Sequence, residues 1–274
     1  MKGIISGIKR MEIHDGDGLR TTVFFKGCPL KCLWCHNPES ILPKPQIAFF
    51  REKCIGCGAC HGERTEIAAK NCPTEALVAY GRQMEPEELV AELQKDDVFF
   101  RQSGGGVTLS GGECLAQPAF ALEVARLLSE KRISVYVDTC GFVQRRTLAA
   151  MLPYTDKFLY DIKAINPAVH KKCTGQDNAQ ILDNLKFLSA SGSRIEVRYP
   201  LIQGYNDGEA KEIGRFLQNL PGITAVKVLK YHRFAGSRYE ALGMKNTLPD
   251  TETTDFTMKT VMQTLKNYGL NVII

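Results

Sequence analysis

The distribution of cysteines constrains this chain more than any other sequence feature. Ten cysteines occur in 274 residues, and seven of them fall between residues 28 and 72. Disulfides are rare in reducing compartments, where such a cluster is more often a metal site. Cys114, Cys140 and Cys173 stand alone, and we interpret them as small buried hydrophobic side chains. The sequence therefore predicts a metal-binding protein.

Composition and charge indicate a globular protein and argue against nucleic-acid-binding and membrane proteins. The chain is 44% hydrophobic and 24% charged, as in ordinary globular proteins. Its net charge of +5 favours an acidic partner but is too small to predict nucleic-acid binding. No apolar run approaches the roughly 20 residues of a membrane helix, and the N-terminus does not resemble a signal peptide. We expect a cytoplasmic monomer that binds neither nucleic acid nor membrane.

Apolar runs alternate with amphipathic segments from about residue 104 onward, and one earlier strand precedes the first cysteines. The predicted strands are Thr21–Phe25, Gly106–Leu109, Ser134–Asp138, Lys157–Asp161, Arg194–Tyr199 and Ala225–Lys230. The predicted helices are Pro86–Leu93, Pro118–Ser129, Arg145–Leu152, Ala179–Ser189, Gly208–Asn219 and Thr254–Asn267. This alternation predicts an α/β fold with a parallel sheet that right-handed crossovers curl into a partial (β/α)6, TIM-like barrel.

The domain organisation follows from a break in this alternation. Residues 41–80 begin with a proline-rich stretch, hold four cysteines and show little periodicity. We predict that residues 1–40 and 81–274 form the barrel and that 41–80 form an inserted module held together by metal.

Polar residues follow the predicted strands, at the end where such barrels place their chemistry. They are Cys28, Ser110 to Glu113, Asp138, Thr139, Asp161, Lys163, Arg198, Lys230 and His232. We expect these side chains to converge on one site.

The first cysteine group is Cys28, Cys32 and Cys35, with gaps of three and two residues. Thiolates suit iron–sulfur clusters or zinc, and three of them leave one metal position open. His36 directly follows and could complete a small zinc site, which is the alternative. A zinc site would not explain the glycines and charged residues at the other strand ends.

The spacing C-x3-C-x2-C, with Trp34 before the third cysteine, resembles the motif of the radical S-adenosylmethionine (SAM) enzymes. The strings Asp15-Gly-Asp-Gly-Leu-Arg20 and Cys35-His-Asn-Pro-Glu39 resemble the glycyl-radical-enzyme activating subgroup, which includes pyruvate formate-lyase activase. Asp17 stands where that activase has proline, a departure that we expect to matter little.

The resemblance implies a 4Fe–4S cluster on Cys28, Cys32 and Cys35 that binds SAM and cleaves it to a 5′-deoxyadenosyl radical. It also implies which residues contact SAM. They are Trp34, Gly111, Gly112, Glu113, Asp138, Asp161, Lys163, Arg198 and His232. Glu113 would receive the ammonium group, and Arg198 the carboxylate. Asp138, Thr139 and Asp161 match positions that hold a monovalent cation, although a helix-capping role is the alternative.

The inserted module contains Cys54, Cys57 and Cys60, followed by Cys72 after eleven residues. This pattern resembles a bacterial ferredoxin site and implies one auxiliary 4Fe–4S cluster, hence two clusters in the chain. His61 could replace Cys72 as a ligand. A zinc knuckle is the alternative for the module.

The resemblance implies an anaerobic activating enzyme that abstracts hydrogen from a glycine of a partner glycyl radical enzyme. Asp15 would meet the glycine loop, and a flavodoxin or ferredoxin would donate the electron. Two rival functions stay open: a radical SAM enzyme acting on a small molecule or peptide, and an iron–sulfur electron-transfer protein. The identity of the partner is not predicted.

Overall fold

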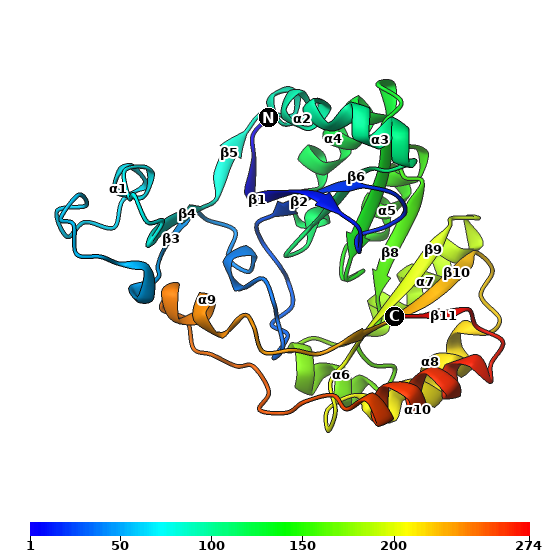
Figure 1. Ribbon diagram of the computed structural model, residues 1–274. Coiled ribbons are helices and arrows are strands. Elements are labelled where there is room, and N and C mark those ends of the chain that lie inside the picture. Colours follow the sequence, from blue (N-terminus) through cyan, green and yellow to red (C-terminus); the bar gives the residue numbers. More distant parts are fainter.

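The computed structural model describes all 274 residues and shows a barrel-like sheet with helices outside it (Figure 1). The sheet has nine strands in the order β11-β10-β9-β8-β7-β6-β2-β1-β5. They are β1 (Gly3–Glu12), β2 (Arg20–Phe25), β5 (Arg82–Met84), β6 (Gly106–Gly111), β7 (Ser134–Thr139), β8 (Lys157–Asp161), β9 (Ile195–Leu201), β10 (Ile223–Lys230) and β11 (Val272–Ile273).

Seven neighbouring strands, β2 and β6 to β11, are parallel, and β1 joins β2 and β5 in antiparallel register. The six predicted strands are confirmed as β2 and β6 to β10, each with ends close to those expected. β1, β5 and β11 were not predicted. The α/β class with a largely parallel sheet is confirmed.

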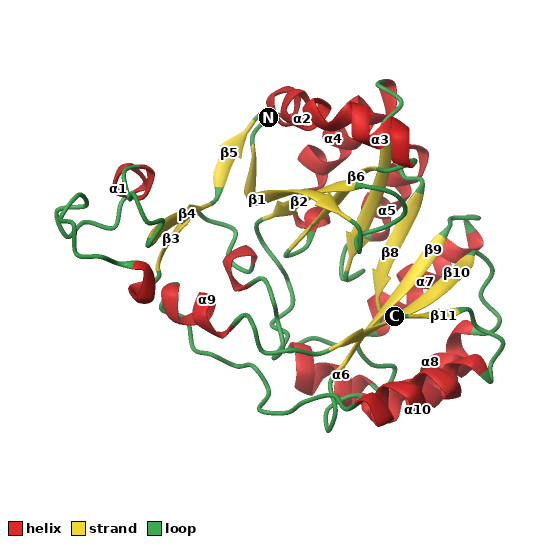
Figure 2. Cartoon of the chain, viewed as in Figure 1, coloured by secondary structure: helices red, strands yellow, loops and turns green.

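Helices cover the outer face of the sheet (Figure 2). They are α2 (Pro86–Leu93), α3 (Asp97–Ser103), α4 (Pro118–Glu130), α5 (Arg145–Met151), α7 (Ala179–Ala190), α8 (Ala210–Leu217) and α10 (Asp255–Lys266). Two further helices pack elsewhere: α6 (Pro167–Thr174) against the cysteine loop and α9 (Gly236–Ala241) against the segment around β3. Six of all these helices correspond to the predicted helices, whereas α3, α6 and α9 were not predicted. The structure contains no helix that is both long and apolar enough to span a membrane.

Side chains alternate along the strands between an apolar outer face and a polar inner face. In β9, Val197 and Tyr199 belong to the core under the helices, whereas Glu196 and Arg198 do not. The same alternation places Tyr136 and other polar residues of β2, β6, β7 and β8 inside the barrel. The outer face buries a cluster of 42 residues that stabilises the fold. The inner face is left for polar chemistry.

Residues 41–80 extend away from the barrel at the left of Figure 1. They contain β3 (Gln46–Phe49) and β4 (Leu77–Tyr80), which pair antiparallel in a sheet of their own, and the short helix α1 (Glu66–Lys70). The base of the segment packs against α9 through Ala48, Phe50 and Ala241. No side chain from residue 51 to residue 67 is buried.

Candidate active site

The first cysteines lie on a loop, residues 26–37, that directly follows β2. Two distant helices hold this loop in place. The backbone N–H of Leu33 donates to the carbonyl of Cys173 in α6 at 2.9 Å. The hydroxyl of Tyr239 in α9 donates to the carbonyl of Cys35 at 3.1 Å. The loop conformation therefore depends on the folded barrel and on the C-terminal segment.

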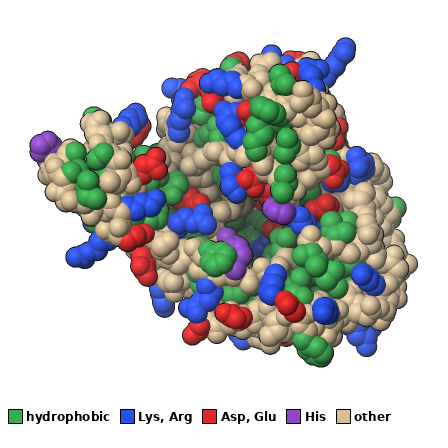
Figure 3. Space-filling view, viewed as in Figure 1, with side chains coloured by type: hydrophobic (Ala, Val, Ile, Leu, Met, Phe, Trp, Pro, Cys, Tyr) green, Lys and Arg blue, Asp and Glu red, His purple; other side chains and the backbone are tan.

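Cys28, Cys32 and Cys35 are free thiols that line one cavity of about 230 Å³ at the carboxyl ends of the strands. Most of the other sequence-predicted residues line the same cavity. They are Trp34, Gly111, Gly112, Asp138, Thr139, Asp161, Lys163 and Arg198. In the space-filling view the molecule is hollowed in its middle, with charged and histidine side chains around the hollow (Figure 3). The predicted convergence of these strand ends is found in the structure.

Gly111 and Gly112 bring the end of β6 against the cysteine loop. A Cβ atom on Gly112 would lie 2.6 Å from the carbonyl oxygen of Gly27 and 3.0 Å from Cβ of Cys28. Gly111 has a φ of +118°, and a Cβ there would meet the backbone of Phe25. A larger residue at either position would push the two loops apart.

An ion network occupies the inner wall of the cavity. The Arg198 guanidinium lies 3.3 Å from a carboxylate oxygen of Asp15 and 3.4 Å from one of Asp138. The Lys163 ammonium lies 2.7 Å from Asp161, as expected for two residues on the same side of the chain. Burial raises the pKa of Asp138 to about 7, and the nearby Arg198 cation offsets only part of this effect.

The chemistry of the side chains at this cavity, three thiols beside two cations, suits the predicted cluster and cofactor. Burial raises the pKa of the Cys32 thiol and raises that of Cys35 to about 12, so these thiolates need a bound metal to compensate for their charge. The buried Nε atom of Arg198 makes no hydrogen bond, and the carboxylate that faces it is that of Glu196 at 3.7 Å. No three His, Cys, Asp or Glu side chains lie close enough together to hold a single metal ion.

Glu113 does not line this cavity, which differs from the expectation that its carboxylate receives the SAM ammonium. The side chain is fully buried, and its oxygens accept hydrogen bonds from Leu115 N at 3.0 Å, Thr139 Oγ1 at 2.9 Å and Cys140 N at 2.8 Å. Glu113 thus joins the ends of β6 and β7. The Thr139 hydroxyl, which was expected to face a cation, donates its hydrogen bond to Glu113.

His232 also lies outside the cavity. Its ring stacks on His36, with ring centroids 4.1 Å apart, and on Phe234. Nε2 of His36 lies 2.8 Å from the carbonyl oxygen of His232. His36 itself lines the cavity beside Cys35. In this structure His232 supports the cysteine loop from the C-terminal side.

No pattern in the sequence indicates the contacts of Asp17. The Asp17 carboxylate accepts hydrogen bonds at 2.7 Å from Lys157 Nζ and from Tyr136 OH. Burial opposes ionisation of Asp17, but the hydrogen bonds from Lys157 and Tyr136 outweigh it and hold the pKa below its ordinary value. Asp17 therefore joins the loop before β2 to β7 and β8. The expectation that the departure from proline matters little stays a prediction. Cys140 was not predicted as a cavity-lining residue.

The insert cysteines are free thiols at the surface of the extended segment. Cys54 and Cys57 are exposed, and Cys60 and Cys72 are partly buried. No three of them form a group that could hold one metal ion. Metal sites in small modules generally form together with the bound metal.

Comparison with known proteins agrees with this architecture. Residues 22–217 match the Radical SAM superfamily. A domain of a pyruvate-formate lyase-activating enzyme from Bacteroides vulgatus is 26% identical, with a TM-score of 0.54, over 62% of this chain and 99% of that one. QueE from Escherichia coli shares the fold, with a TM-score of 0.53 at 11% identity over 99% of this chain and 93% of that one.

Several curated relatives match over most of their length. The trans-4-hydroxy-L-proline dehydratase activating enzyme of Clostridioides difficile is 38% identical over 89% of both chains. The isethionate sulfite-lyase activating enzyme of Nitratidesulfovibrio vulgaris is 36% identical over 88% of this chain and 87% of that one. The benzylsuccinate synthase activating enzyme of Thauera aromatica is 32% identical over 99% and 92%. The chain therefore belongs to the radical SAM superfamily and, within it, to the activating enzymes of glycyl radical enzymes.

Proposed function

We propose that this activating enzyme binds its 4Fe–4S cluster through Cys28, Cys32 and Cys35 and binds SAM in the adjoining cavity. The observation that carries the assignment is the convergence of three thiols from one loop with charged residues of four strand ends on a single cavity. When bound and reduced, the cluster supplies the electron that cleaves SAM to a 5′-deoxyadenosyl radical.

The protein residues orient the cofactor and exclude water. Arg198 and Lys163 are the two cations at this wall of the cavity, so both suit the carboxylate of SAM. Gly111 and Gly112 leave room for close approach of a ligand to the backbone. Asp138 and Asp161 provide hard oxygen ligands at the same wall, where we propose the monovalent cation. Trp34, buried beside Cys35, packs in a small apolar cluster and would flank the adenine of SAM.

We propose a partner from the dehydratase and lyase groups of glycyl radical enzymes. The curated relatives activate a hydroxyproline dehydratase, an isethionate lyase, a sulfopropanediol dehydratase and a choline lyase, according to their names. Asp15 contacts Arg198 at the inner wall and is our candidate for meeting the backbone of the glycine loop. A flavodoxin or ferredoxin would supply the electron.

The inserted module, residues 41–80, would hold an auxiliary 4Fe–4S cluster on Cys54, Cys57, Cys60 and Cys72. The absence of any buried side chain from residue 51 to residue 67 supports this proposal, because such a segment needs a metal to compensate for its missing core. A zinc knuckle predicts zinc instead of iron in the purified protein, and His61 as ligand predicts that Cys72→Ser keeps the metal.

Reductive cleavage of SAM tests the main assignment. Anaerobically reconstituted protein treated with dithionite and SAM should release 5′-deoxyadenosine, and Cys32→Ala should not. Cys57→Ala serves as the matched control, since it removes a thiol of the insert and should retain cleavage. Equal release by Cys32→Ala and wild type would overturn the assignment of the first cysteine group.

A further inference from the structure

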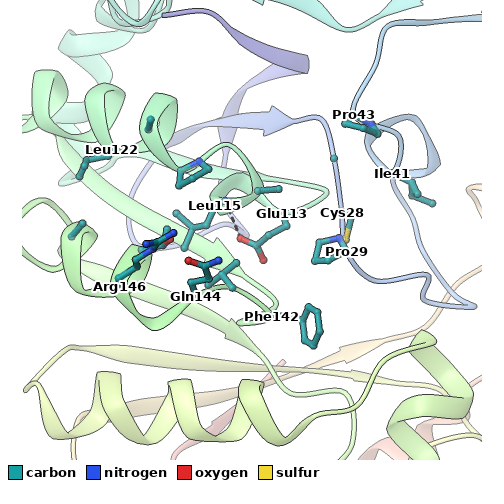
Figure 4. A pocket seen from close by; sticks show the side chains of 17 residues that line it. Cys28, Pro29, Ile41, Pro43, Glu113, Leu115, Leu122, Phe142, Gln144 and Arg146 are labelled. Atoms are coloured by element: carbon teal, nitrogen blue, oxygen red, sulfur yellow. Dashed lines mark hydrogen bonds between the residues drawn. The ribbon is translucent and has the colours of Figure 1, made fainter.

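A second cavity, of about 730 Å³, lies on the outer side of the cysteine loop (Figure 4). Its walls come from α4, α5 and the chain around Pro29 and Pro43. Leu115, Leu122 and Phe142 make its interior largely apolar. Figure 4 shows Cys28 and Pro29 at one end and Arg146 at the other. Nothing in the proposed binding of SAM uses this groove.

Cys28 is the one residue that lines both this groove and the cofactor cavity. A group bound in the groove would therefore touch a cluster ligand on the side away from SAM. The cofactor cavity has to admit SAM and the glycine loop of the partner. The groove reaches the same cluster ligand from another side. A third molecule could therefore bind in the groove while SAM and the glycine loop occupy the cofactor cavity.

Charge at the edge of the groove indicates the kind of molecule that binds. Arg146 lines the groove, and Lys44 is the next residue in the chain after Pro43, which also lines it. Both side chains are exposed, and neither takes part in an ion pair. The carboxylate in the wall, Glu113, is fully buried and hydrogen-bonded on both oxygens. The groove thus combines an apolar interior with a basic edge, on a chain of net charge +5.

We infer that this groove docks the electron donor, an acidic one-electron carrier protein that inserts the apolar edge of a flavin. The inference rests on the proposed function, because only a cluster on Cys28 needs a donor at this position. An aromatic ring edge suits a groove lined by prolines, leucines and Phe142, whose volume is within the range of ligand pockets. The transfer moves one electron and no atoms: the cluster is reduced from the 2+ to the 1+ state as the carrier is oxidised by one electron.

Two variants test the groove, one through the charge at its edge and the other through the space in its interior. Arg146→Glu combined with Lys44→Glu reverses the charge at its edge, and Ala119→Trp fills its interior from α4. Lys211→Glu on α8 is the matched control, because Lys211 is an exposed lysine without an ion pair in the structure. The probe is an acidic flavodoxin. Its dissociation constant is measured by calorimetry at low and high salt, and its rate of cluster reduction is compared with that of dithionite.

The charge-reversal and groove-filling variants should each bind flavodoxin about tenfold more weakly or worse, and the charge reversal should also remove most of the salt dependence. Dithionite should reduce both variants at the wild-type rate, and Lys211→Glu should behave as wild type with both reductants. Flavodoxin binding within twofold of wild type in both variants overturns the inference. So does a loss confined to activation of the glycyl radical enzyme, which would assign the groove to that partner. Failure of wild type to cleave SAM with dithionite would count against the proposed function, whereas flavodoxin binding would still report on the groove.

Discussion

The guanidinium of Arg198 lies 3.3 Å from the carboxylate of Asp15, although 183 residues separate them. Arg198 is on β9 and lines the cofactor cavity, whereas Asp15 is on the loop before β2. The same guanidinium lies 3.4 Å from Asp138, and its Nε, which makes no hydrogen bond, lies 3.7 Å from the Glu196 carboxylate. Arg198 therefore links the proposed SAM site to the loop proposed to meet the substrate glycine.

Replacing Arg198 should weaken SAM binding. Arg198→Ala would leave Asp15 and Asp138 without this cationic partner and would remove one of the two cations proposed for the SAM carboxylate, at a cost of roughly 1–3 kcal/mol. That corresponds to a dissociation constant about five- to 150-fold larger. Equilibrium dialysis of labelled SAM measures the effect, with Arg215→Ala on α8 as a control that removes an exposed ion pair. An affinity within twofold of wild type would mean that Arg198 serves the fold alone.

Each of the two cysteine groups should account for about half of the bound iron. Two 4Fe–4S clusters imply about eight iron atoms per reconstituted chain. The triple variant Cys54→Ala, Cys57→Ala and Cys60→Ala should retain about four, and so should Cys32→Ala. Iron and sulfide analysis with zinc determination measures this result. Wild-type protein with about four irons would show that the insert holds no such cluster.

The ion pair between Glu39, just after the cysteine loop, and Arg238 on α9 should stabilise the folded position of the loop. Arg238 Nη1 lies 2.7 Å from Glu39 Oε1, and Glu39 Oε2 is buried without a partner. Arg238→Met would leave the buried carboxylate unpaired and lower the free energy of unfolding by about 1–3 kcal/mol. Urea unfolding measures this change. Adding Glu39→Gln should restore part of it, and purely additive losses in the double variant would show that the two residues do not interact.

Stability should depend on pH through Asp138. Its pKa is raised from 3.8 to about 7 in the folded protein, so between these values the folded state binds a proton that the unfolded state lacks. The free energy of unfolding should therefore fall as pH rises through this window and level off above about pH 7. Asp138→Asn should remove this part of the fall, as measured by urea unfolding without SAM at about pH 5 and pH 7.5. An unchanged pH dependence in the variant would exclude Asp138 as its source.

The parallel strands could be predicted because their sequence pattern follows directly from their environment. β7 and β8 each place apolar residues outward under the helices and polar residues inward, and both end close to the residues expected. β1 escaped prediction because Ser6 and Gly7 interrupt its pattern and its outer residues are half-exposed. α6 shows weak apolar periodicity, but Asn166, Pro167 and Gly175 are its cap signals and could have revealed it.

The sequence predicted most of the residues that form the site, but it did not predict which way all of their side chains point. Motif spacing brings Glu113 to the end of β6, but only the fold shows that its carboxylate turns toward Thr139 and Cys140. The role of Asp17 depends on Lys157, a partner 140 residues away that no local pattern indicates. Pairings of this kind arise because the loop between β1 and β2 lies against side chains of β7 and β8, and sequence spacing alone does not contain them.

The substrate of this enzyme is tested most directly by electron paramagnetic resonance. The protein is incubated without oxygen with a reductant, SAM and a glycyl radical enzyme encoded beside it. We expect a doublet signal from a glycyl radical, which disappears when the radical glycine of the partner is replaced by alanine and when Cys32 of this chain is replaced by alanine. Production of 5′-deoxyadenosine with no glycyl radical on any glycyl radical enzyme tested would contradict the account and favour a small-molecule or peptide substrate.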